Sequence, residues 1–369
     1  MTGAALVQHS WALVEPRAEE LAKYFYATLF CTAPETRELF PINMQIQRAR
    51  LLRAVAHVVG HLERPEEIRP FLAQLGRDHR KFGVVPGHYR AFGEAFVAAV
   101  RHVSGPRWSY ELDRAWSWAF SFLMSEMTRA AREESGPASW LGRVVDHRRP
   151  TSGVAVVAVQ TTSPVPYRAG QYVSVETPRR PRAWRYLSPA NAPNADGVLE
   201  FHVRAVPGGS VSGTIVWHSR LGDTWRIGPA LGQLPFHIDP ARRLLLIAGG
   251  TGVAPMKAML EAMAQRPDSP RTELFLGARH WSDLYALDTV RSMSYRHPWL
   301  EVIPVVENDA TAAGAEHGTL ADVVTRYGAW ADHEVLIAGS PGMIRATVSR
   351  MLVAGTPLHH IHYDPFVQD

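Results

Sequence analysis

Residues 244–256, LLLIAGGTGVAPM, decide the fold of the C-terminal part of the chain. An apolar run over residues 244–248 leads into the glycine turn 249–252, and apolar residues then recur at helical spacing over residues 256–263. A strand, a glycine turn and a helix in this order predict the opening of a nucleotide-binding α/β domain, because glycines let the backbone approach a pyrophosphate. The alternative is a glycine turn that binds nothing.

Two kinds of β-sheet are predicted around this segment. After it, short apolar runs alternate with helical segments, which indicates a parallel sheet; these runs lie at residues 273–276, 300–306 and 334–338. Before it, alternating runs separated by Pro and Gly predict strands of an antiparallel barrel; these runs lie at residues 154–159, 172–175 and 199–203.

The N-terminal part, from Leu6 to about Arg132, is predicted to be helical throughout. Its apolar residues recur at helical spacing, as over residues 51–62. Prolines that suit helix starts or turns divide it into segments of helix length, and they are Pro16, Pro34, Pro41, Pro65, Pro86 and Pro106. A globin fits this pattern, and so does a helical bundle without a ligand.

The length of the chain favours several domains, and its net charge argues against a nucleic-acid-binding or membrane-binding protein. The 369 residues favour two or three domains, and 39 basic against 35 acidic residues give a net charge of only +4. No basic run is long enough for a nucleic-acid or membrane surface. One local cluster is either a solvated loop or an attractor for an anionic cofactor, and it comprises Arg179, Arg180, Arg182 and Arg185.

The first residues of the chain bear on the protein's cellular location, and its cysteine content bears on the metal ligands that it can offer. The first ten residues lack a basic and then apolar leader, and no run approaches the roughly 20 apolar residues of a membrane span. We therefore expect a soluble cytoplasmic protein. Cys31 is the only cysteine, which excludes an intramolecular disulfide and a thiolate metal cluster.

A histidine-containing segment in the helical part points to a family. Residues 75–89, LGRDHRKFGVVPGHY, resemble the proximal segment of flavohaemoglobins and bacterial haemoglobins. The resemblance implies that His79 ligates haem iron and that Tyr89, just inside the next helix, contacts His79. A neutral imidazole suits this role when its other ring nitrogen is held by a hydrogen bond.

The resemblance also implies a distal pocket. Residues 24–30, YFYATLF, resemble the segment that carries the distal tyrosine. Tyr26 and Gln47 would then donate hydrogen bonds to iron-bound dioxygen, Phe40 would wedge against the haem, and Leu51 would close the apolar roof. Gln45 is a rival to Gln47, although Gln47 and Leu51 are one helical turn apart. The alternative is that the apolar and aromatic members are ordinary core residues.

One position departs from the family pattern. The family's proximal network usually ends in a glutamate on the last helix, and Ala131 occupies that position here. Glu133 and Glu134 are near, so the network is either shifted or missing. Either change would weaken the electron push from His79.

The middle of the chain resembles the barrel domain of the ferredoxin–NADP reductase superfamily. Residues 169–175 and 184–191 carry this resemblance, which places Arg185 on the FAD pyrophosphate and Ser188 near the isoalloxazine. Leu187 stands where the signature has tyrosine, so either Tyr186 or another aromatic substitutes or the flavin is held more loosely. The predicted FAD-contacting residues are Gln171, Tyr172, Arg185, Tyr186, Leu187, Ser188, Gly209, Val211 and Ser212.

The C-terminal part resembles the nucleotide domain of the same superfamily. Its predicted nicotinamide-nucleotide site comprises Gly250, Thr251, Gly252, Val253, Ala254, Pro255 and Gly339. Ala338 replaces the family's usual cysteine, and Phe366 is the candidate for the aromatic that covers the flavin. Arg279 either meets a 2′-phosphate or forms a salt bridge, so both NADH and NADPH stay open.

The resemblance covers nearly the whole chain and implies a multidomain protein. We expect an all-α globin haem domain (residues 1–138), an antiparallel β-barrel FAD domain (139–238) and an α/β Rossmann-like NAD(P) domain (239–369). The implied cofactors are haem b, FAD and NADH or NADPH, and the expected partners are O2 and NO but not nucleic acid. The protein is expected to be a monomer.

The implied activity is nitric oxide dioxygenation. Electrons would pass from NAD(P)H through FAD to the haem, where bound O2 oxidises NO to nitrate. Two alternatives stay open: a haem- and flavin-dependent oxidase or monooxygenase that acts on another substrate, and an O2- or NO-binding sensor globin.

Overall fold

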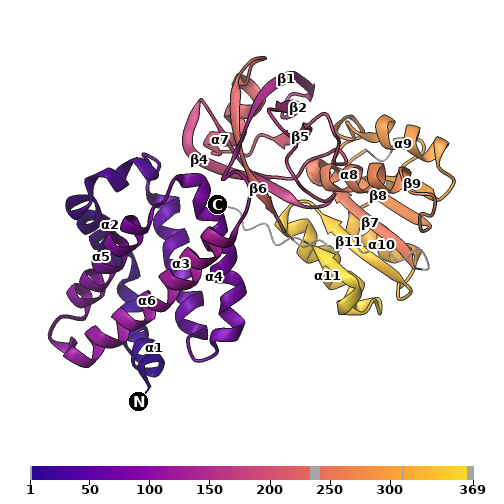
Figure 1. The fold of residues 1–369 in the computed structure, drawn as a ribbon. Coiled ribbons are helices and arrows are strands. Elements are labelled where there is room, and N and C mark those ends of the chain that lie inside the picture. The colour runs from indigo at the N-terminus through magenta and orange to yellow at the C-terminus, as the bar shows by residue number, and fades with distance from the viewer. Residues whose placement is uncertain (1, 233–241, 310, 364–369) are drawn as a thin grey trace. The chain divides into compact units, whose positions relative to one another are not determined.

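The computed structural model describes residues 2–232, 242–309 and 311–363 of the chain. It divides into two compact units, Met1–Ser139 and Trp140–Asp369. The first unit is helical, and the second contains two β-sheets with their helices (Figure 1). This confirms the expected combination of an all-α part, an antiparallel sheet and an α/β part.

Two helices of the helical unit begin at prolines that the sequence predicts as helix starts or turns. Pro65 and Pro86 are the first residues of their helices, where the missing N–H of proline is not needed. The side chain of Ser109 caps the last helix by accepting the N–H of Leu112 at 3.3 Å. The helices are α1 (Gly3–Val14), α2 (Ala18–Thr32), α3 (Gln45–His61), α4 (Pro65–His79), α5 (Pro86–Ser104) and α6 (Tyr110–Glu133).

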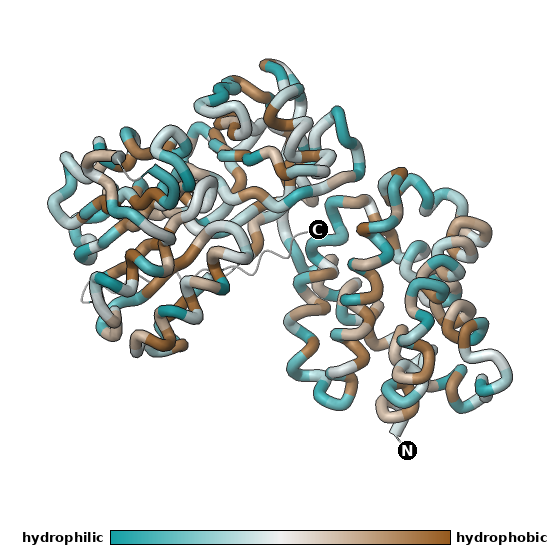
Figure 2. Tube along the Cα trace, turned by 180° about the vertical axis from the view of Figure 1, so that it is seen from behind, coloured by the Kyte–Doolittle hydropathy of each residue, from teal (hydrophilic) through white to brown (hydrophobic). Residues whose placement is uncertain are grey.

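Large aromatic side chains form the core of the helical unit. Phe25, Phe96 and Trp116 are buried, and the rings of Phe96 and Trp116 lie 5.9 Å apart. Burying such rings is a major source of folding free energy. The indole N–H of Trp116 donates to Ser10 Oγ at 3.3 Å, so its one polar atom is satisfied. The helices carry apolar residues in stripes along their length (Figure 2).

The second unit begins with an antiparallel sheet in the order β4-β3-β6-β1-β2-β5. Val157, Phe201 and Trp225 lie in its buried core. An isolated bridge pairs Pro189, beyond the end of β4, with Phe201 in β5, so the two edges of the sheet approach each other. The elements are β1 (Trp140–Thr151), β2 (Val154–Thr161), β3 (Tyr172–Thr177), β4 (Arg180–Leu187), β5 (Val198–Arg204), α7 (Ser210–His218) and β6 (Thr224–Leu231).

The arginine cluster is mostly part of the sheet and not a solvated loop. Arg180, Arg182 and Arg185 lie in β4, whereas Arg179 lies in the turn between β3 and β4. Strand β4 is an edge strand, and an edge tolerates the charges and the proline that made this segment resemble a loop.

The parallel sheet confirms the α/β prediction. Its order is β10-β9-β8-β7-β11-β12. Leu244 and Leu246 of β7 pack in the cluster that includes α8 and α9, whereas Leu245 and Ile247 pack in the cluster with α10 and α11. Successive strand residues point to opposite faces, so helices cover both sides. The elements are β7 (Arg243–Gly249), α8 (Val253–Ala264), β8 (Thr272–Ala278), α9 (Leu287–Arg296), β9 (Leu300–Val306), β10 (Glu316–His317), α10 (Leu320–Tyr327), β11 (His333–Ala338), α11 (Pro341–Val353) and β12 (Ile361–Tyr363).

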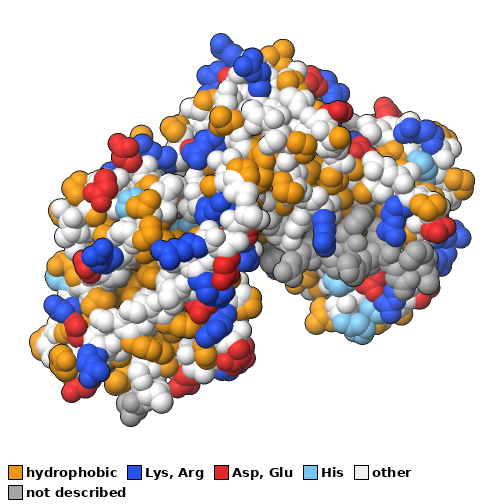
Figure 3. Space-filling model, in the orientation of Figure 1, with side chains coloured by type: hydrophobic (Ala, Val, Ile, Leu, Met, Phe, Trp, Pro, Cys, Tyr) orange, Lys and Arg blue, Asp and Glu red, His pale blue; other side chains and the backbone are white. Residues whose placement is uncertain are grey.

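The surface agrees with the small net charge of the sequence. Basic and acidic side chains are interspersed on the face drawn in Figure 3. Within the described residues, no helix combines the length and the apolar character that crossing a bilayer requires.

Candidate functional site

His79 is the last residue of helix α4, and one of its ring nitrogens already forms a hydrogen bond. Its Nδ1 lies 2.7 Å from the carbonyl oxygen of Leu75, one turn earlier in the helix. A carbonyl can only accept, so Nδ1 carries the proton and Nε2 keeps a free lone pair in the neutral ring. Burial lowers the pKa of His79, which favours this neutral form. The imidazole is therefore held in the tautomer that ligates a metal through Nε2.

The predicted distal residues come together in the helical unit. Tyr26 in α2 is 5% exposed, and the Gln47 side chain, in the first turn of α3, is the polar neighbour of its hydroxyl. The ring of Phe40 meets the Tyr26 ring edge-on at a centroid distance of 5.3 Å. Leu51 lies one turn beyond Gln47 in α3 and is partly buried, whereas Gln45 is exposed. Burial raises the pKa of Tyr26, so its hydroxyl stays protonated and can donate.

The glutamates near position 131 pair with arginines in the structure. Tyr89, in the first turn of α5, is partly buried, which raises its pKa to about 12. Glu134, just beyond α6, lies 3.8 Å from Arg77 Nε, and Glu133 pairs with Arg129 at 3.1 Å. Both glutamates that are close to position 131 in the sequence are therefore paired with arginines, and the His79 ring donates to a neutral carbonyl.

The flavin signature lies on strand β4, and its residues point to two different faces. Arg185 pairs with Val175 of β3, and Leu187 pairs with Val173, so these two signature residues share one face. Tyr186 lies on the other face, where its ring contacts Tyr172 at a centroid distance of 5.1 Å. The register therefore does not bring Tyr186 to the position that Leu187 occupies. Ser188 follows directly after the strand.

The other predicted flavin residues shape two turns. Gln171 accepts the N–H of Arg168 at 2.8 Å and donates to the Gly232 carbonyl at 3.1 Å, which holds the start of β3. Gly209 caps helix α7, Val211 is buried, and Ser212 Oγ accepts the N–H of Val206 at 3.1 Å. The nine-residue helix α7 presents its N-terminus at this turn, where backbone N–H groups can bind an anion.

The glycine turn lies at the point where the order of the parallel sheet reverses. Strand β7 has β8 on one side and β11 on the other, and the carboxyl end of such a pair is where α/β sheets bind ligands. Gly250 has φ +56°, and a Cβ at Gly252 would lie 2.2 Å from the carbonyl oxygen of Ala338. Only glycine fits this approach. The predicted residues after the turn open helix α8 and are buried; they are Val253, Ala254 and Pro255.

Arg204 is a residue that sequence reasoning missed. It ends β5 in the antiparallel part, yet its Nη1 lies 3.5 Å from the point where a Cβ of Gly250 would be. A guanidinium at a glycine turn can bind a phosphate oxygen. The sequence places Arg204 between a strand and a glycine turn, and only the tertiary structure brings it to Gly250.

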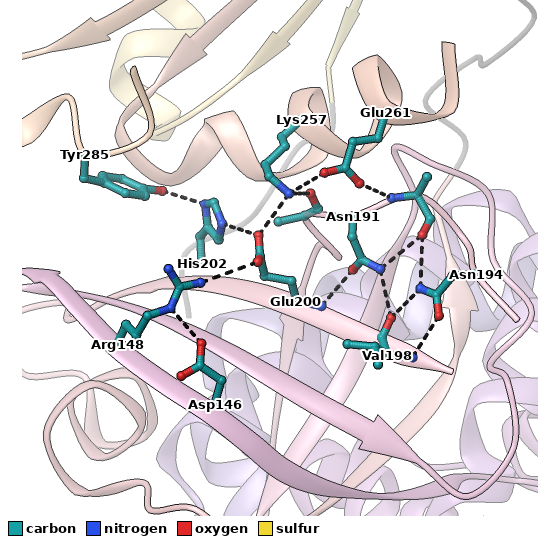
Figure 4. A network of polar contacts seen from close by, with 12 residues as sticks. Asp146, Arg148, Asn191, Asn194, Val198, Glu200, His202, Lys257, Glu261 and Tyr285 are labelled. Atoms are coloured by element: carbon teal, nitrogen blue, oxygen red, sulfur yellow. Dashed lines mark hydrogen bonds and ion pairs between the residues drawn. The ribbon is translucent and has the colours of Figure 1, made fainter. Parts of the chain in front are cut away.

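A polar network between the two sheets was also missed (Figure 4). Lys257 of α8 lies 3.1 Å from Glu200 Oε1 in β5, and His202 Nε2 lies 2.9 Å from the same oxygen. His202 Nδ1 is 2.9 Å from the hydroxyl of Tyr285. Burial by itself raises the pKa of Glu200, but the hydrogen bond from His202 and the charge of Lys257 together lower it to about 2.

The remaining predictions concern the ends of the nucleotide site. Gly339 follows β11, next to the Ala338 carbonyl that Gly252 approaches. Arg279, just after β8, is exposed, and the carboxylate of Asp309 accepts the neighbouring backbone N–H of Trp281. Phe366 lies outside the described residues.

Models of known domains match the chain in the predicted order. The globin model matches residues 23–127, the oxidoreductase FAD-binding domain matches residues 143–236, and the oxidoreductase NAD-binding domain matches residues 246–349. A flavohemoprotein of Rhizobium meliloti is 26% identical over 100% of this chain and 96% of its own length. These three domains in this order, with relatives of this name along the whole chain, support a flavohaemoglobin. A flavohemoprotein of Bordetella parapertussis is 28% identical and covers 80% of this flavohaemoglobin and 78% of its own chain.

Solved structures agree with this fold. A flavohemoglobin from Malassezia yamatoensis, solved with bound FAD and haem, has a TM-score of 0.77 over 97% of this flavohaemoglobin and 98% of its own chain, at 16% identity. The chain is also similar to the electron transfer component of a xylene/toluene monooxygenase from Pseudomonas putida, at 31% identity over 55% of this chain and 58% of that protein. The second unit, Trp140–Asp369, with its FAD-binding and NAD-binding domains, is called the reductase part below. The prediction of haem, FAD and nicotinamide cofactors is confirmed at the level of the domains that bind them.

Proposed function

We propose that this flavohaemoglobin is a nitric oxide dioxygenase that uses NADH or NADPH. The observation that carries the proposal is the pair Tyr26 and Gln47, which lies in the same helical unit as a histidine held in the metal-ligating tautomer. His79 would hold haem iron through Nε2, and Tyr26 with Gln47 would supply hydrogen-bond donors on the distal side. A cytoplasmic location belongs to the same proposal.

The reductase residues would deliver the electrons. Arg185 and the start of α7 would bind the FAD phosphates, while Gly252 and Arg204 would bind the dinucleotide pyrophosphate. The bound flavin would take two electrons together and release them singly, as iron requires. One NO and one O2 need one electron to form nitrate, so each reduced nicotinamide would support two turnovers.

The proposal is tested by NO consumption. The purified protein, loaded with haem and FAD, is mixed with NADH or NADPH in aerated buffer, and NO is followed with an electrode while nitrate is measured. We expect O2-dependent and NAD(P)H-dependent conversion of NO to nitrate. A protein that oxidises NADH in air but leaves NO untouched contradicts the proposal.

One observation favours a second candidate, an oxidase or monooxygenase acting on another substrate. Arg77 and Arg129 engage the carboxylates of Glu134 and Glu133, and the His79 ring donates to the Leu75 carbonyl. A carbonyl gives the imidazole less basicity than a carboxylate does, so the iron would receive a weaker electron push. The similarity of the reductase part to a monooxygenase electron transfer component fits this candidate as well. Substrate-dependent O2 uptake without NO would select it.

A further inference from the structure

Lys257 connects the two motifs that the reductase part uses for its two nucleotides. It lies in the second turn of α8, the helix that starts directly after the turn Gly250–Gly252. Its ammonium donates to the carbonyl of Ala190 at 3.0 Å. Ala190 is two residues beyond Ser188 of the flavin signature. The ammonium therefore joins the nicotinamide-nucleotide helix to the flavin-signature loop.

The contacts of this ammonium are complete. A lysine ammonium has three hydrogens, and Lys257 Nζ has three acceptors: Ala190 O at 3.0 Å, Glu200 Oε1 at 3.1 Å and Glu261 Oε1 at 2.6 Å. The residue is only 8% exposed, so water competes little for these bonds. A buried charge with every donor satisfied holds one geometry, because breaking any of these bonds leaves an unpaired buried group.

A second hydrogen bond connects helix α8 to the same loop at another residue. Glu261, one turn after Lys257 on the same face of α8, accepts the backbone N–H of Ala192 through Oε2 at 2.9 Å. The loop is thus held at Ala190 and at Ala192 by two side chains of a single helix. Two fixed points limit both the distance and the rotation of the helix relative to the loop.

We propose that Lys257 is a positioning residue for electron transfer from the nicotinamide to the flavin, fixing helix α8 against the flavin-signature loop through Ala190, Glu200 and Glu261. The inference rests on the proposed path from NAD(P)H to FAD. In that step the C–H bond at C4 of the dihydronicotinamide breaks and an N–H bond forms at N5 of the flavin, so two electrons move with the hydrogen. The rate of such a transfer depends steeply on the alignment of donor and acceptor.

The test compares three variants of the full-length protein loaded with haem and FAD. Lys257→Met removes the three donors and keeps an unbranched apolar chain of similar length. The double variant Lys257→Met with Glu200→Gln also removes the carboxylate charge that the first change leaves without its lysine partner. Arg350→Met is the matched control, because Arg350 forms an exposed ion pair with Asp322 at 2.7 Å within the parallel-sheet part.

Anaerobic stopped-flow mixing with NADH measures flavin reduction, and thermal unfolding measures stability. In Lys257→Met we expect the reduction rate at saturating NADH to fall at least about tenfold, with the half-saturating NADH concentration changed less than about twofold. In the double variant the unfolding temperature should rise towards that of the unmutated protein, while flavin reduction stays slow. Arg350→Met should keep the unmutated rate.

Two outcomes overturn the proposal. One is an unchanged reduction rate in Lys257→Met, and the other is a rate that recovers together with the unfolding temperature in the double variant, which indicates a purely structural role. Hydrogen exchange in peptides covering residues 188–194, measured without nicotinamide, gives a separate readout. Exchange in these peptides should be faster in Lys257→Met, because Lys257 holds both the Ala190 carbonyl and the Glu261 carboxylate that accepts the Ala192 N–H. Unchanged exchange contradicts the tie itself.

A failure of the proposed electron path can be distinguished from a failure of the Lys257 proposal. If NADH and NADPH do not reduce the flavin of the unmutated protein, the path from NAD(P)H to FAD is wrong. The exchange comparison then still decides whether Lys257 holds the loop.

Discussion

Gly76 of α4 and Met127 of α6 bring their two helices together at backbone distance: a Cβ at Gly76 would lie 2.2 Å from the Met127 carbonyl oxygen. Gly76 is three residues before His79, so this contact fixes the end of the helix that carries the proposed iron ligand. A side chain at this position must push α4 away from α6, because the obstacle is backbone and cannot rotate aside.

Gly76→Ala should destabilise the helical unit. Forcing one methyl group into a packed contact costs about 1–3 kcal/mol. Gly60→Ala is the control, since Gly60 is an exposed position in α3 with nothing within 4 Å of its added Cβ, and alanine there should stabilise by about 0.5–1 kcal/mol. Urea unfolding followed by circular dichroism measures both. Equal stabilities for the two variants would contradict the close contact.

Tyr26→Phe should impair chemistry at the haem without affecting the reductase. It removes the hydroxyl that pairs with Gln47, and loss of one donor to a developing charge costs about a hundredfold in turnover. NO consumption should fall accordingly, whereas flavin reduction by NADH should not change. Tyr24→Phe serves as the control, because Tyr24 in the same helix is 37% exposed and stacks on His102. Full NO consumption by Tyr26→Phe would argue against a distal role.

Gly252→Ala should block use of the nicotinamide nucleotide. The added Cβ would meet the Ala338 carbonyl oxygen at 2.2 Å, so the turn must move away from β11. Displacement of the turn by an ångström is expected to slow flavin reduction by NADH about a hundredfold, while dithionite still reduces the haem. In Gly342→Ala, which adds a methyl group where no atom lies within 4 Å, the rate should be retained.

Glu200 predicts how the reductase part responds to acid. Its pKa is lowered to about 2 in the folded protein from an ordinary value of 4.5, so folding favours the ionised carboxylate. The stabilisation is fully present above pH 4.5 and is lost as the pH falls towards 2, by about 3 kcal/mol at most. Thermal unfolding measured between pH 5 and pH 2.5 should show a shallower decline in Glu200→Gln. Parallel curves for the variant and the unmutated protein would contradict this assignment.

The sequence predicts features whose cause is local. The turn Gly250–Gly252 is recognisable because strand, turn and helix are contiguous, and the start of α4 because Pro65 itself sets the helical φ. Strand β4 resembles a loop because edge strands tolerate charge and proline. The sequence pattern does not reveal strand β1, since its polar and charged residues 146–149 interrupt the apolar alternation.

The missed residues have partners that are distant in the chain. Lys257 meets Ala190 across 67 positions, and no spacing rule links a lysine in a helix to a carbonyl in an earlier loop. Arg204 approaches Gly250 in the same way. By contrast, the two faces of β4 follow from strand alternation alone, so the separation of Tyr186 from Leu187 is implicit in the sequence once the strand is recognised.

The antiparallel sheet also carries protection against self-association. Strand β4 has Pro181 between two arginines, and the bridge from Pro189 to Phe201 covers part of β5 at the opposite edge. An open strand edge recruits strands from other molecules and starts aggregates, whereas proline and charge repel them. We therefore expect these edges to protect the newly synthesised reductase part from aggregation before it binds flavin.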